Sequence, residues 1–211
     1  AYALVALSIS VPASAQDGFR FSSLAVGSGE SPVSNGLSGT LLMENEQKHV
    51  IDITLQEEQA WVKYGLNFKT GRLEGNVSGA VGHFQGAPWV SPYLDLKFQL
   101  AQVAGHKVTI GALQWPAFFI GREPNNWKND GVKNPEKVLV GYLYGFNLNV
   151  GPLGLDYSFL DFLDEPFNSL PGVNFTQKIR KDLAVTASGT YNKNAKKPMF
   201  FIGATWTPEK K

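Results

Sequence analysis

Apolar and polar residues alternate along this chain in about a dozen short segments that follow one another from Phe19 to Trp206. The clearest copy runs from Tyr93 to Val103. Its even positions from 94 to 100 read Leu, Leu, Phe and Leu, and the odd positions between them read Asp, Lys and Gln. A period of two residues is typical of a β-strand with one apolar and one polar face. The pattern therefore predicts an all-β protein.

Twelve strands are expected from this alternation. Their predicted ranges are 19–27, 37–45, 49–56, 60–69, 72–83, 92–103, 106–116, 137–150, 153–163, 172–181, 183–192 and 198–207. The connections between them alternate in length. The longer ones are 28–36, 84–91, 121–136, 164–171 and 193–197, the shorter ones are 46–48, 70–71, 104–105, 151–152 and 182, and the short connection near Glu57 and Glu58 is the exception. Short turns at one end and long loops at the other are typical of an up-and-down barrel.

Strand length and face composition indicate which face of the sheet points outward. Most predicted strands are about 9 to 12 residues long, which is the span that a tilted strand needs to cross a bilayer. The polar faces contain mainly Ser, Thr, Asn and Gly, as in 183–192, whereas a water-facing surface would be rich in Lys and Glu. We therefore expect an antiparallel up-and-down transmembrane β-barrel of about 12 strands, with its apolar face against lipid and a wet lumen.

Composition adds limits on partners and on export. The chain has 211 residues, no cysteine and a net charge of +1, so nucleic acid is not an expected partner. Residues 1–15 are uncharged and end in Ala13-Ser14-Ala15, the small-x-small pattern of a signal-peptidase site. We expect a truncated signal peptide at 1–15 and a single barrel domain at 16–211 in an exported protein.

Residues 16–211 resemble a Gram-negative outer-membrane β-barrel of porin-like type, similar in size to small twelve-stranded channels. The segment Phe201–Trp206 resembles the carboxy-terminal signal of such proteins, a glycine followed three residues later by an aromatic, although Thr207–Lys211 extend beyond it. The resemblance implies a location in the outer membrane of a Gram-negative bacterium. It also implies contact with the lipid bilayer and lipopolysaccharide, insertion by the barrel-assembly machinery, and passage of small polar solutes.

Candidate catalytic residues are few. Outer-membrane phospholipases and deacylases place a histidine close in sequence to a serine nucleophile, and none of His49, His83 and His106 has such a serine. The acidic residues of the segment 161–165 are interpreted as part of a solvated loop. No metal-ligand spacing and no phosphate-binding loop is present, so we expect no enzymatic activity, no metal and no cofactor.

Charged residues on the polar faces are the candidate lumen residues. The basic ones are Arg20, Lys63, Lys69, Lys97, Lys107, Lys178 and Arg180, and the acidic ones are Asp52, Glu74, Asp95 and Asp156. The basic excess predicts a mild preference for anionic or neutral polar solutes. The longest connection could form a constriction or an outer lip, and its candidate residues are Arg122, Glu123, Trp127, Lys128 and Asp130.

Aromatic residues near predicted strand ends are interpreted as girdles at the two bilayer interfaces; they are Trp61, Tyr93, Trp115, Tyr191 and Trp206. Two alternatives to an open channel remain. The first is a structural or adhesive outer-membrane barrel that binds through its outer loops, because Leu139, Leu143, Leu160 and Phe162 fall on the predicted lumen face and could occlude it. The second is a soluble exported β-barrel that encloses a lipophilic ligand within its apolar face.

Overall fold

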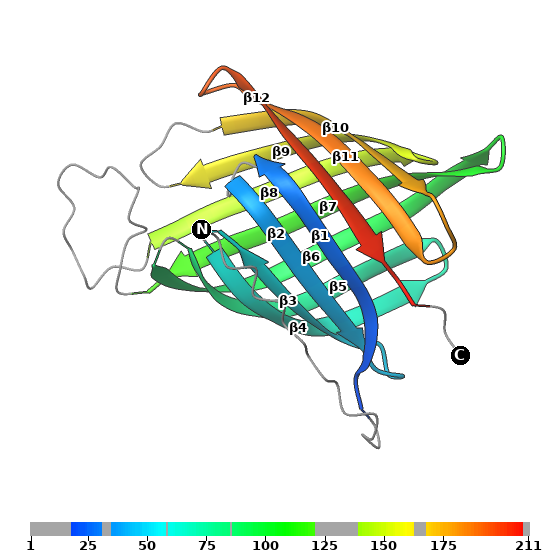
Figure 1. The fold of residues 1–211 in the computed structure, drawn as a ribbon, viewed down its shortest axis with the longest axis horizontal. Helices are drawn as coiled ribbons and strands as arrows, with labels where there is room; N and C mark the ends of the chain where they lie inside the picture. Colours follow the sequence, from blue (N-terminus) through cyan, green and yellow to red (C-terminus); the bar gives the residue numbers. More distant parts are fainter. Residues whose placement is uncertain are drawn as a thin grey trace.

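Twelve strands close into one antiparallel barrel (Figure 1). The structure is a computed structural model, and it describes residues 18–30, 35–57, 59–84, 86–120, 139–162 and 168–208. The strands are β1 (Arg20–Glu30), β2 (Asn35–Glu44), β3 (His49–Gln56), β4 (Gln59–Thr70), β5 (Leu73–Phe84), β6 (Ala87–Val103), β7 (His106–Phe119), β8 (Leu139–Val150), β9 (Leu153–Phe162), β10 (Asn168–Lys178), β11 (Leu183–Asn192) and β12 (Lys197–Trp206). The predicted up-and-down barrel of about 12 strands is confirmed.

Each strand pairs with its neighbours in sequence, and the blue strand β1 pairs with the red strand β12 to close the sheet (Figure 1). The tight connections 71–72 and 104–105 lie at one end of the barrel, called here the turn end. The connection 120–138 leaves from the opposite end, called here the loop end. The predicted signal peptide at 1–15 lies outside the described residues. Among the described residues, no helix has the length and apolar character needed to cross a membrane.

Contacts between strands that are not neighbours identify the interior of the barrel. The rings of Trp61 on β4 and Trp115 on β7 lie 5.7 Å apart between centroids, although β5 and β6 separate these strands in the sheet. Two such side chains can meet only on the concave side. Because side chains alternate along a strand, the rows that contain Trp61 and Trp115 point inward and the intervening rows point outward.

The outward rows are apolar. On β10, Val173 and Phe175 are 52% and 47% exposed, whereas Asn174 between them points inward and donates a hydrogen bond to Asp156 on β9. On β6, the row formed by Leu94, Leu96, Phe98 and Leu100 is likewise outward. Phe98 and Leu100 in this row are 42% and 46% exposed. The predicted lipid-facing apolar rows are therefore confirmed. A soluble barrel with its apolar face enclosed is excluded, because that face is on the outside.

Strand β6 begins at Ala87 rather than at residue 92, so the predicted long connection 84–91 is wrong. Phe84 pairs with Ala87, and only 85–86 connect β5 to β6. Pro88 and Pro92 lie in this part of β6, and proline interrupts a hydrogen-bonded ladder. The interruption affects only one neighbouring strand. Residues Ser91 to Tyr93 have no paired residue on β7, whereas their pairing with β5 continues. Since 57–58 and 85–86 both lie at the loop end, connection length does not alternate strictly.

Candidate functional site

The inner wall of β4 to β7 changes in character from the loop end to the turn end. Nearest the loop end is an aromatic tier formed by Trp61, Phe84, Trp89, Trp115 and Phe119. Its three tryptophan rings lie 5.4 to 6.3 Å apart between centroids. Trp89 and Phe119 are almost fully buried at 2% and 3% exposure, while Trp61 and Trp115 are partly exposed. Two indoles of the aromatic tier, those of Trp61 and Trp115, are therefore partly accessible.

Gly82 on β5 allows the aromatic tier to pack. A Cβ atom at this position would lie 2.4 Å from the carbonyl oxygen of Ala60 and 2.8 Å from Cζ2 of Trp89. Any side chain would therefore push the sheet or the indole away. Within the tier the indole Nε1 of Trp115 is buried and has no hydrogen-bond partner among the described residues.

The aromatic tier corrects part of the predicted interfacial girdles. Trp61, Tyr93 and Trp115 lie on inward rows, so their assignment to a lipid interface is wrong. Tyr191 and Trp206 lie on outward rows and are 44% and 43% exposed, as a girdle requires. The sequence carried the relevant signal, because Trp61 has the same parity as Lys63 on its strand and therefore belongs to the polar row.

The opposite wall is also apolar near the loop end. Leu143, Leu160, Leu170 and Met199 pack together there from four strands. Leu170 is only 1% exposed, and it lies in a segment that was predicted to be a loop. The side chains of Leu139 and Phe162 are not among those described. Together with the aromatic tier, this cluster narrows the loop-end half of the lumen.

A network of charged and hydroxyl groups lies next to the aromatic tier, on its side toward the turn end. Lys63 Nζ lies 2.9 Å from Asp52 Oδ2, and both side chains are about 15% exposed. Thr54 donates a hydrogen bond of 3.0 Å to the other Asp52 oxygen and lies 2.9 Å from the hydroxyl of Thr40. The Lys63 ammonium also lies 4.3 Å from the ring centroid of Tyr93. These contacts satisfy a partly buried ion pair that would otherwise be costly.

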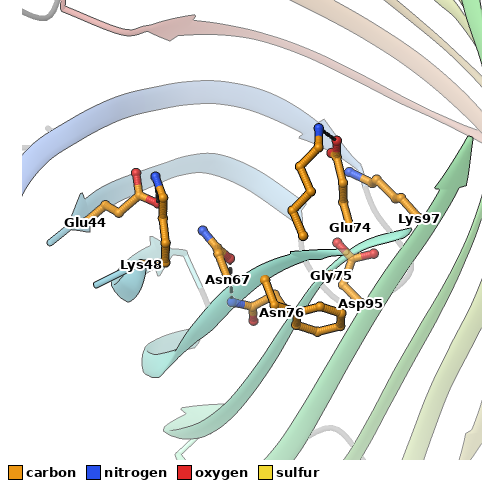
Figure 2. A pocket seen from close by; sticks show the side chains of 10 residues that line it. Glu44, Lys48, Asn67, Glu74, Gly75, Asn76, Asp95 and Lys97 are labelled. Carbon is orange, nitrogen blue, oxygen red and sulfur yellow. Dashed lines mark hydrogen bonds and ion pairs between the residues drawn. The ribbon is translucent and has the colours of Figure 1, made fainter. Parts of the chain in front are cut away.

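A polar pocket of about 390 Å³ occupies the turn-end part of the same wall (Figure 2). It is lined by Glu44, Lys48, Asn67, Phe68, Lys69, Glu74, Gly75, Asn76, Asp95 and Lys97. Figure 2 shows Asn67 and Asn76 in the middle of the pocket, with Glu44 and Lys48 on one side and Glu74, Asp95 and Lys97 on the other. We call this site the mixed-charge pocket.

Amides and hydroxyls line the facing wall at the turn end. Asn149 donates a hydrogen bond to Asn147 on β8, and the hydroxyls of Thr176 and Thr186 lie 3.0 Å apart across β10 and β11. Asp156 accepts its hydrogen bond from Asn174 in the same region. The turn-end half of the lumen is therefore polar on both walls.

The structure places most of the predicted lumen residues on the inner face. Lys63, Asp95, Lys97, Asp156 and Lys178 all lie on inward rows. Arg20 is the first residue of β1 at the turn-end mouth, where its guanidinium lies 3.1 Å from Glu46 Oε1. The candidate loop residues Arg122, Glu123, Trp127, Lys128 and Asp130 lie outside the described residues.

Arg180 requires a correction, because β10 ends at Lys178 and Arg180 lies in the turn 179–182. There its guanidinium lies 2.9 Å from Asp182 Oδ2. Desolvation alone would raise the pKa of the Asp182 carboxyl, but its own backbone N–H, the Arg180 guanidinium and the Trp206 indole together lower it. Arg180 therefore lies beside this carboxylate in the turn and not on a strand of the lumen wall.

Ion pairing reduces the charge that the lumen offers to a solute. Asp52 pairs with Lys63, Glu74 with Lys69, and Glu44, which the sequence analysis missed, with Lys48. On the inward rows of the described strands, the lysines without a salt bridge are Lys97, Lys107 and Lys178, and the aspartates without one are Asp95 and Asp156. The remaining excess of positive charge is small.

The outer wall holds two of the three histidines. His49 stacks on Tyr64, with Nδ1 lying 2.9 Å from the tyrosine hydroxyl, and His83 is exposed on an outward row of β5. His106 begins β7 at the turn end, beside the turn at Gly151.

No protein-family model and no curated protein matches this chain. Solved structures of three outer-membrane proteins are similar. The NanC porin has a TM-score of 0.60 at 8% identity, with 89% of this chain and 100% of that chain covered. The KdgM porin has a TM-score of 0.58 at 8% identity, with 90% and 100% covered. Omp33 of Acinetobacter baumannii has a TM-score of 0.50 at 14% identity, with 92% and 100% covered. The chain therefore has the fold of a porin-like outer-membrane β-barrel.

Proposed function

We propose that this protein is a passive outer-membrane channel for small polar solutes. The observation that carries the proposal is the combination of apolar outward rows with a polar, hydrogen-bonded lumen inside a closed barrel. Barrels of eight strands are just filled by their own side chains, whereas barrels of sixteen or more leave a wide aqueous channel. Twelve strands lie between these limits, so the size of the inward side chains decides what passes.

The environment of the protein follows from this proposal. We place it in the outer membrane of a Gram-negative bacterium, where the outward apolar rows contact the bilayer and lipopolysaccharide borders the loop end. The segment Phe201–Trp206, which forms most of β12, would be read by the barrel-assembly machinery during insertion. Its glycine lies beneath an aromatic ring, since a Cβ at Gly203 would lie 2.9 Å from Cε1 of Phe201. The proposal assigns no catalytic reaction to the chain.

A weak preference for anions is part of the proposal. Among the described residues of the inner wall, three lysines but only two aspartates lack a salt bridge. Charges on a pore wall bias which ions pass. Lys107 and Lys178 both lie near the turn end and belong to no ion pair among the described residues.

In liposomes that contain the purified barrel, neutral polar solutes of the size of small sugars are expected to enter at rates that fall with solute size. In planar bilayers under a salt gradient, the reversal potential is expected to show slight anion preference. Lys107→Gln combined with Lys178→Gln is expected to shift this potential toward cations. A strongly cation-selective wild-type channel would contradict the proposed selectivity.

An occluded barrel that binds through its loops is the second candidate function. The observation in its favour is the depth of packing near the loop end, where Leu170 and Trp89 are 1% and 2% exposed. The same liposome experiment separates the two functions, because an occluded barrel admits no solute of any size. Absence of solute entry from correctly folded, heat-modifiable protein would replace the channel with this second function.

A further inference from the structure

The mixed-charge pocket carries both signs of charge in equal number. Three ammonium groups line it, from Lys48, Lys69 and Lys97, and three carboxylates, from Glu44, Glu74 and Asp95. The pocket is therefore dense in charge but close to neutral in sum. A wall of this kind does not favour a simple anion or a simple cation, because each would meet as much repulsion as attraction.

Two of the six charged groups, Asp95 and Lys97, form no salt bridge within the described part of the chain; Lys97 lies opposite Glu74, but the Glu74 carboxylate is already paired with Lys69. Lys48 lies 3.7 Å from Glu44, and Lys69 pairs with Glu74. Asp95 and Lys97 make neither a salt bridge nor a hydrogen bond with any described residue, although Asp95 is only partly exposed. A carboxylate and an ammonium group thus remain available to a solute in the same pocket.

Asp95 and Lys97 are also placed to act together. They are two residues apart on β6, so both point inward and their Cα atoms are separated by about 7 Å along the strand. Across the sheet they lie opposite Asn76 and Glu74 of β5. Asn76 donates a hydrogen bond of 2.8 Å to Asn67. Figure 2 shows Lys97 beside Glu74, and Asn67 and Asn76 on the neighbouring part of the pocket wall, where Asn76 is the register partner of Asp95.

We propose that the mixed-charge pocket binds small zwitterions, such as free amino acids, as they cross the barrel. The ammonium group of the solute pairs with Asp95, its carboxylate pairs with Lys97, and the amides of Asn67 and Asn76 hydrogen-bond its other polar atoms. A zwitterion is the class of solute that satisfies both unpaired charges at once. The inference rests on the proposed channel function, because the solute reaches the pocket through the lumen.

Four molecules of nearly equal size separate the classes of solute. L-alanine is the zwitterion, L-lactate the anion, L-alaninamide the cation and L-lactamide the neutral reference. Initial rates of uptake of the radiolabelled compounds into proteoliposomes are measured at neutral pH and low salt, each divided by the rate for lactamide. The expected result is the highest ratio for alanine, by about two- to fivefold over lactate and alaninamide.

Variants of the two unpaired residues test the assigned roles. Asp95→Asn is expected to favour lactate over alanine, and Lys97→Gln to favour alaninamide over alanine. The exchange of the two charges, Asp95→Lys with Lys97→Asp, is expected to retain the preference for alanine. Leu96→Ala, on the outward row between them, serves as the matched control and should leave all ratios unchanged. Heat-modifiable migration on gels verifies that each variant folds.

The outcomes distinguish this inference from the channel function. If lactamide enters but alanine shows no advantage, or if the advantage survives in both single variants, the zwitterion site is overturned while the channel stands. If lactamide does not enter, the channel function fails. In that case, calorimetry of alanine binding to the detergent-solubilised barrel tests the zwitterion site independently of transport. A heat of binding that Asp95→Asn abolishes supports the site. No heat of binding in the wild type overturns the site.

Discussion

Val173→Arg is expected to lower the free energy of unfolding of the barrel in a lipid bilayer by about 2–4 kcal/mol. Val173 lies at the centre of β10 on an outward row and is 52% exposed. In the membrane this position faces acyl chains near the middle of the bilayer, where a guanidinium group loses its hydration. Urea titration of the protein folded into vesicles, followed by tryptophan fluorescence, measures the change.

Asn174→Arg is the matched control, because it adds the same side chain one residue further along the same strand. Asn174 points inward and already contacts the Asp156 carboxylate, so the new guanidinium would lie in a polar lumen beside an opposite charge. We expect a change of about 1 kcal/mol or less. Equal costs at the two positions, or a larger cost at Asn174, would contradict the assignment of the two faces.

Trp61→Ala combined with Trp115→Ala is expected to raise the single-channel conductance about two- to threefold, because apolar constrictions limit conduction by excluding water. These two indoles are the partly exposed members of the aromatic tier, and their ring centroids lie 5.7 Å apart across the inner wall. Removing both widens the lumen and removes apolar surface at the narrowed loop-end half. Planar-bilayer recording of single channels at fixed salt gives the result directly.

Trp206→Ala provides the control for this pair of substitutions. Trp206 lies on an outward row at the end of β12, so it borders the membrane rather than the lumen. Its replacement is expected to leave the conductance unchanged. An unchanged conductance in the folded Trp61 and Trp115 double variant would show that the aromatic tier does not limit the current.

The number of strands and the identity of the lipid-facing rows could be predicted from the sequence. The alternation of apolar and polar residues depends only on residues that are neighbours in the sequence. In a barrel with an apolar exterior this alternation is preserved on nearly every strand. The start of β6 was not predicted. Pro88 and Pro92 lie at outward positions of this strand and cost only part of the ladder with β7, while Trp89 packs inside the barrel.

The candidate site could be predicted only in part, because it depends on register between distant strands. Lys63, Asp95 and Lys97 were recognised as inward from their own strands. The contact of Lys63 with the Tyr93 ring could not be predicted, since it joins β4 to β6 across β5. Arg180 was misplaced because β10 ends at Lys178, three residues before the predicted end at 181, so that Arg180 lies in the turn 179–182.

The central claim is that apolar rows face lipid and polar rows face a water-filled lumen. The chain has no cysteine, so single cysteines can be introduced along β10 and labelled with a nitroxide one position at a time. Electron paramagnetic resonance of the labelled protein in bilayers compares collision with oxygen, which concentrates in lipid, and with a water-soluble nickel complex. The account predicts alternation with a period of two residues, with oxygen preferred at 173 and 175 and nickel preferred at 172, 174 and 176. Nickel preference at 173 and 175, or no alternation, would contradict it.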